Sequence, residues 1–318
     1  MVSQLERHQV WVYLAAILVG LLVGSGLGDG AERLDVAVRP ALGALLFVTF
    51  LQVRFELLGA AAKDVRFTAT VLVANFLVVP LVVWALLPVV GSDPAVRLGV
   101  LLVLLAPCTD WFVTFTQLAR GDTPRAVSIM PLNLVLQLAL LPLYLWLLHG
   151  EAFDEIIDLG SATTTFVVII VVPLSAAWLV RSKWDRATGL GLTQRAGTLA
   201  VPLVAVVVFL VAASQVSVVT DSLDLLPRLG VAYVAFAVAA LVIGVASSRL
   251  AGLEPASART LTFSVGTRNS FVVLPFALAV PDAYQLAVVV VVFQSLVELV
   301  AMVAYLQVVP RLLPERVT

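Results

Sequence analysis

The residues of this sequence best suited to chemistry lie where polar side chains interrupt apolar runs. The stretch LLAPCTDWFVTF, residues 104–115, places Pro107, the one cysteine Cys108, Thr109 and Asp110 side by side. A thiolate is a soft ligand that prefers thiophilic centres to hard ions. An aspartate is costly in apolar surroundings unless it faces a cavity. The alternative is a structural cysteine that packs as a small apolar side chain.

A second polar interruption, SVGTRNS at 264–270, contains Gly266, Arg268 and Asn269. A buried arginine is as costly as a buried aspartate, and such residues mark solute pathways or pair with one another. Arg268 is therefore either a solute ligand or the partner of Asp110 in an ion pair that joins the two interruptions. Both roles are compatible with each other.

Two apolar segments carry polar pairs spaced by four residues, which share one face of a helix. Glu298 follows Gln294, and Gln137 follows Asn133. Burial favours the protonated form of a carboxyl group, so Glu298 suits a proton carrier, or a structural glutamate that stays protonated. The amides either line a cavity or join packed helices. We interpret four other residues as packing residues: Arg54, Asn75, Trp111 and Gln215.

The composition places these residues in a lipid bilayer. The chain is 61% apolar and 12% charged, whereas soluble domains are about half apolar and a quarter charged. A net charge of −1 provides no strong electrostatic field for binding nucleic acid. One cysteine excludes an internal disulfide framework, and one cysteine with two histidines disfavours a metal site. No Walker loop, Rossmann glycine pattern or HExxH motif is present. We expect no cofactor, no metal and no enzymatic activity.

Ten apolar windows approach the length of about 20 residues that a membrane-spanning helix requires. The first is interpreted as a retained helix, since no signal-peptidase site precedes Gly28. If the N-terminus is cytoplasmic, fourteen of the 19 Lys and Arg residues lie in cytoplasmic connectors, four lie opposite, and Arg268 lies within a window. The positive-inside rule therefore predicts that both termini are cytoplasmic. The windows are 10–27, 38–53, 68–90, 97–119, 125–148, 162–181, 196–215, 229–250, 258–280 and 284–308.

The acidic connector 149–161 divides one transporter domain, 1–318, into halves 1–150 and 151–318. Five windows per half is an odd number, so the halves have opposite orientation, as in inverted-repeat transporters. The fourth window is interrupted by APCTD and the ninth by SVGTRNS. Pro107 removes a backbone amide, and Gly266 permits conformations that other residues resist. We therefore expect both helix breaks to line one cavity near the bilayer midplane.

These segments resemble the arsenite efflux permeases of the bile acid:sodium symporter and arsenite transporter superfamily. LLAPCTDWFVTFTQLARGD is similar to that family's fourth span, in which a cysteine follows Ala-Pro and a Gly-Asp turn ends the helix. GTRNSFVVLPFALAV and FQSLVELVAMVAYL are similar to the ninth and tenth spans. The likeness extends over nearly the whole chain.

The resemblance implies an all-α fold of two inverted five-helix repeats. In the fold that the resemblance implies, the helices form a core subdomain and a panel subdomain, and the discontinuous helices 4 and 9 cross in the core. It also implies that Cys108 is the essential thiol and Glu298 the tenth-span carboxylate. Arg268 and Asn269 would be the pair at the crossing.

The sequence departs from this pattern in the ninth span. Asn269 is followed by SFV, so the carboxylate usual there in arsenite permeases is missing. The bile-acid branch holds sodium with a glutamate and a glutamine where this chain has Ser264 and Arg268. A fixed cation there argues against a sodium site of that type. The sequence also departs from the family pattern at Asp110, because an aspartate is not expected directly after Pro-Cys-Thr.

The prediction from these residues is an inner-membrane secondary transporter that exports arsenite, and antimonite, in exchange for protons. Cys108 would bind arsenic, and Thr109, Asn133 and backbone groups would contact its hydroxyls. Asp110 or Glu298 would carry the proton. The main alternative is transport of a small organic anion bound by Arg268. A membrane sensor or scaffold is disfavoured because no soluble domain is attached.

Overall fold

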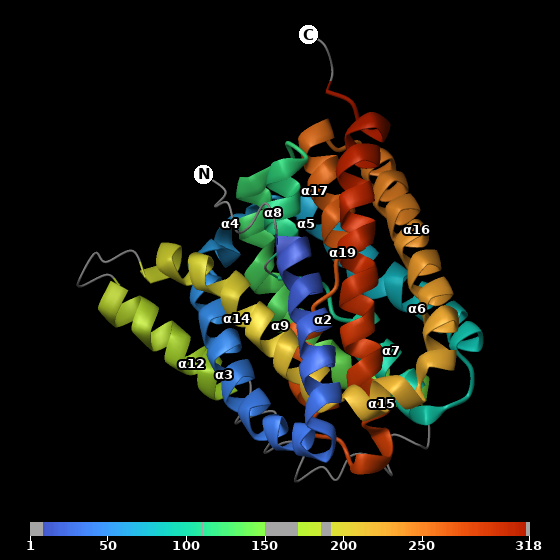
Figure 1. Ribbon diagram of the computed structural model, residues 1–318. Coiled ribbons are helices and arrows are strands. Elements are labelled where there is room, and N and C mark those ends of the chain that lie inside the picture. Colours follow the sequence, from blue (N-terminus) through green and yellow to red (C-terminus); the bar gives the residue numbers. More distant parts are fainter. Residues whose placement is uncertain (1–8, 110, 150–170, 186–191, 316–318) are drawn as a thin grey trace.

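The computed structural model describes residues 9–109, 111–149, 171–185 and 192–315. Nearly all of them lie in helices, which confirms the predicted all-α class for this part of the chain (Figure 1). The principal helices are α2 (Gln9–Leu27), α3 (Asp35–Gln52), α5 (Val65–Val73), α6 (Val79–Val90), α7 (Pro94–Leu104), α8 (Trp111–Leu118), α9 (Thr123–His149), α12 (Val172–Leu179), α14 (Leu192–Ser214), α16 (Leu226–Leu250), α17 (Pro255–Gly266), α18 (Ser270–Ala277) and α19 (Leu286–Leu312).

Several connectors in the described part of the chain contain short helical pieces rather than extended loops. A helical turn satisfies backbone amides and carbonyls within the segment, which matters beside an apolar environment. The longest of these pieces, η1, lies in the α2–α3 connector. The start of α2 and the end of α19 both lie in the upper half of the view in Figure 1. The pieces are η1 (Gly28–Leu34), η2 (Phe55–Leu57), α4 (Leu58–Lys63), α15 (Val216–Asp221), η6 (Leu223–Leu225) and η7 (Asp282–Tyr284).

Five helical stretches are long and apolar enough to cross a membrane, and shorter apolar helices accompany them. The shorter ones include Trp11–Leu27, Pro94–Leu104 and Leu199–Ser214. Part of the predicted window 162–181 lies outside the described residues, and its described part holds α12 and the start of a π-helical segment, η5 (Val180–Asp185). The five long stretches coincide with predicted windows: Asp35–Leu57, Val65–Val90, Thr123–Leu148, Leu223–Leu250 and Leu286–Leu312.

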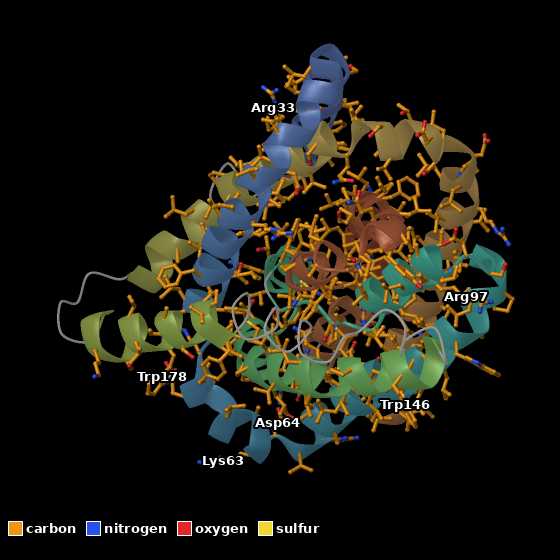
Figure 2. All side chains as sticks on the ribbon, turned by 90° about the horizontal axis from the view of Figure 1, so that it is seen from below. Arg33, Lys63, Asp64, Arg97, Trp146 and Trp178 are labelled. Atoms are coloured by element: carbon orange, nitrogen blue, oxygen red, sulfur yellow. The ribbon has the colours of Figure 1, made fainter. Side chains whose placement is uncertain are left out.

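The exterior of the helix assembly is strongly apolar. One face of α16 carries four valines at a spacing of three or four residues, and each is at least 55% exposed. Trp146 and Trp178 lie at the periphery in the view along the helices (Figure 2), and both are more than half exposed. A contiguous apolar exterior of this kind marks a surface that contacts lipid or protein rather than water. The four valines are Val231, Val234, Val238 and Val242.

The predicted fourth and ninth spans are interrupted helices. α7 and α8 are separated by residues 105–110, and α17 and α18 by residues 267–269. Pro107 cannot donate a helical hydrogen bond, which ends the first half-helix. Asn269 starts α18, since its side chain accepts a hydrogen bond from the amide of Val272 at 3.4 Å. Each half-helix therefore has backbone groups at its broken end that find no partner within the helix itself.

A π-helical segment, η3 (Ala74–Val78), joins α5 to α6. Pro80 follows it, and a proline frees the carbonyl four residues earlier, here that of Phe76. That carbonyl accepts a hydrogen bond from the hydroxyl of Tyr144 on α9. The wider turn directs Asn75, which is completely buried, toward α17. Such π-bulges frequently occur at functional sites.

The helices form two packing groups. α14 packs against α2 and α3, and α12 packs against α3. The other group contains α5 to α9 and α16 to α19, in which α16 packs on α17 and α7 on α19. Close approach of α2 and α14 depends on Gly20 and Gly24. A Cβ atom added at Gly24 would lie 2.3 Å from the carbonyl oxygen of Ala213.

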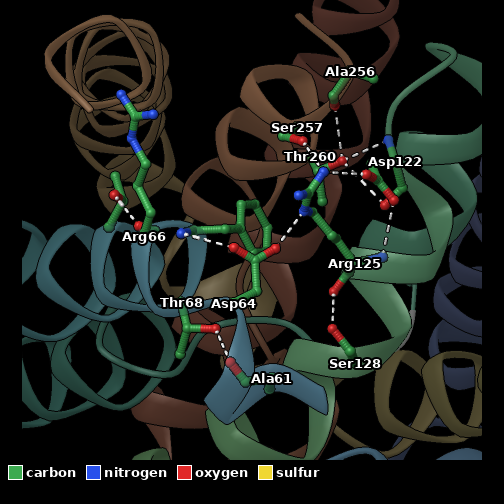
Figure 3. Close-up of polar contacts among 12 residues, drawn as sticks. Ala61, Asp64, Arg66, Thr68, Asp122, Arg125, Ser128, Ala256, Ser257 and Thr260 are labelled. Atoms are coloured by element: carbon green, nitrogen blue, oxygen red, sulfur yellow. Dashed lines mark hydrogen bonds and ion pairs between the residues drawn. The ribbon is translucent and has the colours of Figure 1, made fainter. Parts of the chain in front are cut away.

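A polar cluster ties two connectors to the starts of α9 and α17 at one end of the second group (Figure 3). Arg125, at the start of α9, forms ion pairs with Asp64 at 2.5 Å and Asp122 at 2.7 Å. It also donates to the hydroxyl of Ser257, on α17, at 2.7 Å. Thr260 accepts a hydrogen bond from the amide of Asp122 at 2.8 Å. The start of α17 is thereby attached to the α8–α9 turn.

Candidate functional site

The two helix breaks lie against each other and pair through their backbones. The amide of Cys108 donates to the carbonyl of Thr267 at 3.1 Å, and the amide of Asn269 donates to the carbonyl of Ala106 at 2.7 Å. Pro107 and Arg268 thereby form an isolated antiparallel bridge. Segments about 160 residues apart in sequence thus satisfy one another's backbone groups where neither is helical.

Cys108 and Thr109 are buried at this junction, with exposed fractions of 1% and 0%. The hydroxyl of Thr109 accepts a hydrogen bond from the side-chain amide of Asn269 at 3.0 Å. Asn269 therefore caps α18 with its oxygen and bridges to the first break with its nitrogen. The thiol is in this way set within a hydrogen-bonded frame. Asp110 lies outside the described residues, so its predicted pairing with Arg268 stays a prediction.

Arg268 is completely buried, and its guanidinium bonds to neutral oxygens. Nη2 donates to Oδ1 of Asn75 at 2.8 Å and to the carbonyls of Ser264 at 3.2 Å and Val265 at 2.5 Å. Nη1 donates to the carbonyl of Leu104 at 3.3 Å. The ring of Phe236 lies 5.4 Å from the guanidinium carbon, a cation–π distance. Among the described carboxylates, none lies within ion-pair distance of this guanidinium.

Glu298 is held beside the same junction by a short chain of hydrogen bonds. Its Oε2 accepts from the backbone amide of Arg268 at 2.9 Å and from Nε2 of Gln294 at 2.7 Å. The hydroxyl of Ser270 donates to Oε1 of Gln294 at 2.9 Å. The indole of Trp111 also faces the carboxyl group. The backbone of the second break is thus hydrogen-bonded to a buried carboxyl group on α19.

Asn133 and Gln137 are buried on one face of α9, with exposed fractions of 0% and 1%. All four polar atoms of their amides lack a hydrogen-bond partner within the described part of the chain. Each such atom costs about 1–3 kcal/mol when it is left unsatisfied in an apolar interior. α9 packs against α7, α8 and α17. The two amides are therefore poised to donate to, and accept from, a polar solute.

Gly266 has a different structural reason from the one predicted. Its φ lies outside the left-handed region, and it belongs to the last turn of α17. An added Cβ atom would lie 2.5 Å from the ring of Tyr305 on α19. The absence of a side chain, rather than backbone freedom, is what this position requires.

Two residues at the junction were interpreted from the sequence as packing residues. Asn75 contacts the guanidinium of Arg268, and Trp111 lies beside Glu298 with its ring 5.7 Å from that of Phe271. The signal that could have identified Asn75 is Pro80, which implies a disturbed helix around it. Trp111 carried no distinguishing signal, because aromatic residues in apolar windows are common.

The junction offers a soft sulfur, hydroxyl and amide groups, a buried carboxyl group and a bonded cation. No group of three or more His, Cys, Asp or Glu side chains in the described residues is arranged to hold a metal ion. The arrangement suits recognition of a small solute by one sulfur and several neutral hydrogen-bonding groups. It contains no nucleophile–base pair of the kind that covalent catalysis requires among the residues described above.

Comparisons with known proteins agree with a transport function. The model of the Sodium Bile acid symporter family matches residues 39–222, which is more than half of the chain and includes the first helix break. The Arsenical-resistance protein Acr3 of Corynebacterium glutamicum is 22% identical over 292 residues, covering 84% of this chain and 78% of that protein. An uncharacterized protein of Pseudomonas aeruginosa is 25% identical over 185 residues, covering 54% of this chain and 56% of that protein.

Proposed function

This chain belongs to the sodium bile acid symporter family, and from that premise we propose that it exports arsenite, and antimonite, in exchange for protons. Membership indicates a transporter in the membrane rather than an enzyme. It agrees with the resemblance expected from the sequence. The substrate and the coupling ion are the parts that we propose.

The observation that carries the proposal is the position of the one cysteine. Cys108 lies at the junction of the two helix breaks, and its backbone is bonded to the opposite break. Interrupted helices in transporters form substrate sites near the bilayer midplane. Trivalent arsenic is thiophilic, and sulfur is the soft ligand that such a centre prefers. The relative named for arsenical resistance supports the same solute.

Near neutral pH arsenite is a neutral triol, so its hydroxyl groups need donors and acceptors rather than a counter-charge. The unpartnered amides of Asn133 and Gln137 supply both kinds of group. Thr109 and Asn269 add a hydroxyl and an amide beside the thiol. We propose that these residues contact the hydroxyl groups while Cys108 contacts the arsenic.

Glu298 is the proposed proton carrier, together with Asp110. Its carboxyl group accepts a hydrogen bond from the backbone of Arg268, inside the second break. Protonation would weaken that bond, because a neutral acid is a poorer acceptor than a carboxylate. The geometry of the second break would then respond to the proton. This coupling fits an exchange in which the solute leaves the cell while a proton enters.

The fold that we propose comprises ten spans in two inverted repeats, 1–150 and 151–318, with both termini cytoplasmic in the cell membrane. The packing group of α2, α3, α12 and α14 would be the panel, and the other group the core. Both half-helices α7 and α17 begin with an acidic residue followed by proline, Asp93–Pro94 and Glu254–Pro255, which supports the repeat. Rocking of the core against the panel would give alternating access.

The organic-anion alternative depends on Arg268 as the anion ligand. Its two terminal nitrogens already donate to four protein oxygens, and the side chain is completely buried. A solute anion would have to displace those oxygens. The structure therefore favours arsenite over an organic anion.

The decisive experiment compares Cys108→Ser and Cys108→Ala with the wild type in arsenite-sensitive cells. Serine keeps the size and a hydrogen-bonding group but removes the soft sulfur. We expect both variants to be inserted normally, as judged by membrane abundance and monodispersity in detergent, yet to give no protection. Full resistance from an inserted Cys108→Ser would remove the thiol from the mechanism. If the wild type itself gives no resistance, the arsenite assignment is wrong.

A further inference from the structure

The guanidinium of Arg268 lies in a cage of oxygens that resembles a binding site for an ion. The cage has four members: the carbonyl oxygens of Leu104, Ser264 and Val265, and Oδ1 of Asn75. All four are neutral, and the described carboxylates form no ion pair with the guanidinium. Hard monovalent and divalent cations are held in proteins by oxygens of these types.

The three carbonyls come from the ends of two half-helices. Leu104 is the last residue of α7, and Ser264 and Val265 belong to the last turn of α17. A helix C-terminus carries about half a negative charge, on carbonyls that have no partner within the helix. Two such ends converging on one point supply about one negative charge. One guanidinium matches that charge without a carboxylate.

Asn75 completes the cage from a third element. The π-helical segment turns its side chain inward, where its amide nitrogen donates to the hydroxyl of Ser264 at 3.1 Å. That bond fixes the amide so that its oxygen faces the guanidinium. The cage is thus built by α7, η3 and α17, all of which are present whether or not Arg268 is.

We propose that Arg268 is a resident cation, which occupies an oxygen site that would otherwise bind an alkali metal ion such as sodium. The family is described by its use of sodium, and the cage does not fit sodium while the guanidinium is in it. The tethered cation cannot leave with the solute. It follows that transport by this chain does not require sodium at this position. This consequence rests on the proposed transport function.

Removing the guanidinium should turn the cage into a site for a free cation. In Arg268→Ala, four buried oxygens would lose their donors, each a substantial penalty in an apolar interior. A dehydrated sodium ion would recover those interactions. Arg268→Lys is the matched control, since it keeps a tethered positive charge that can donate to the same carbonyls.

The test uses the full chain, purified in lipid nanodiscs, and needs no arsenite. Thermal unfolding is followed while N-methylglucamine chloride is replaced by sodium or potassium chloride at constant chloride. We expect a saturable rise of the unfolding midpoint of about 3 °C or more for Arg268→Ala in sodium. The wild type and Arg268→Lys should show none. Radioactive sodium should be retained by Arg268→Ala but not by the wild type or Arg268→Lys.

Three results would contradict the proposal. One is a folded Arg268→Ala that behaves identically in sodium and N-methylglucamine. Another is a saturable sodium effect on the wild type. The third involves Arg268→Gln, a second neutral variant. Cellular sodium should fill the cage of both neutral variants and allow them to fold. If neither accumulates in sodium-containing cells while Arg268→Lys does, the proposal is contradicted. None of these results depends on whether arsenite is the solute.

Discussion

The hydrogen bond between Asn269 and Thr109 can be tested as the side-chain link that joins the two helix breaks. Its partners are 160 residues apart, both are nearly completely buried, and the donor–acceptor distance is 3.0 Å. Thr109→Val removes the hydroxyl at nearly constant shape, and Asn269→Ala removes the amide. The double-mutant cycle isolates the energy of the contact from the cost of each truncation.

The expected magnitudes follow from the contacts. Thr109→Val strands one buried amide hydrogen, which should lower the free energy of unfolding by about 1–3 kcal/mol. Asn269→Ala strands the hydroxyl and also removes the cap of α18, whose bond to Val272 is long at 3.4 Å, so we add about 0.5–1 kcal/mol. The double variant should be less destabilised than the sum by about 1 kcal/mol, the value of one neutral hydrogen bond.

The assay is equilibrium unfolding in mixed micelles, followed by tryptophan fluorescence, with all four proteins at one pH. The control pairs Asn269→Ala with Thr262→Val, whose hydroxyl donates only to the carbonyl of Ala258 in its own helix at 2.8 Å. Those two changes share no partner and should add within about 0.5 kcal/mol. A coupling energy of zero between Asn269 and Thr109 would refute the paired-break geometry, and so would equal coupling in the control.

Three further predictions test other parts of the molecule. Glu298→Gln should abolish the response of transport in vesicles to a pH gradient while solute binding persists; equal loss of both would make Glu298 a structural residue or a direct ligand. Gly24→Ala places a Cβ atom 2.3 Å from a backbone carbonyl of α14 and should destabilise the chain by about 1–3 kcal/mol in thermal or denaturant unfolding, whereas Gly26→Ala, with nothing within 4 Å, should be neutral or slightly stabilising. A reporter fused to the C-terminus or inserted at 182–194 should read cytoplasmic, and a periplasmic signal at either place would overturn the ten-span proposal.

Much of the helical architecture could be predicted from the sequence because a membrane restricts what backbone can do. An apolar segment in lipid must satisfy its own amides and carbonyls, so long apolar windows become helices. The five helical stretches that are long and apolar enough to cross a membrane lie where such windows were predicted. The positions of the two breaks also followed from local features, Pro107 and the polar run around Arg268. Periodicity and proline chemistry act over a few residues, and a sequence displays them directly.

The sequence alone could not determine what those breaks contact. That Cys108 bonds to Thr267, and that Asn75 faces Arg268, depends on how α7, α17 and η3 pack. Gly266 was predicted to provide backbone freedom, whereas the structure shows that its missing side chain accommodates the ring of Tyr305, which belongs to another helix. Hydrogen-bond partners of a buried group are chosen by the summed packing of helices far apart in the chain. Local sequence determined which groups must find partners, and only the tertiary structure decided which partners they found.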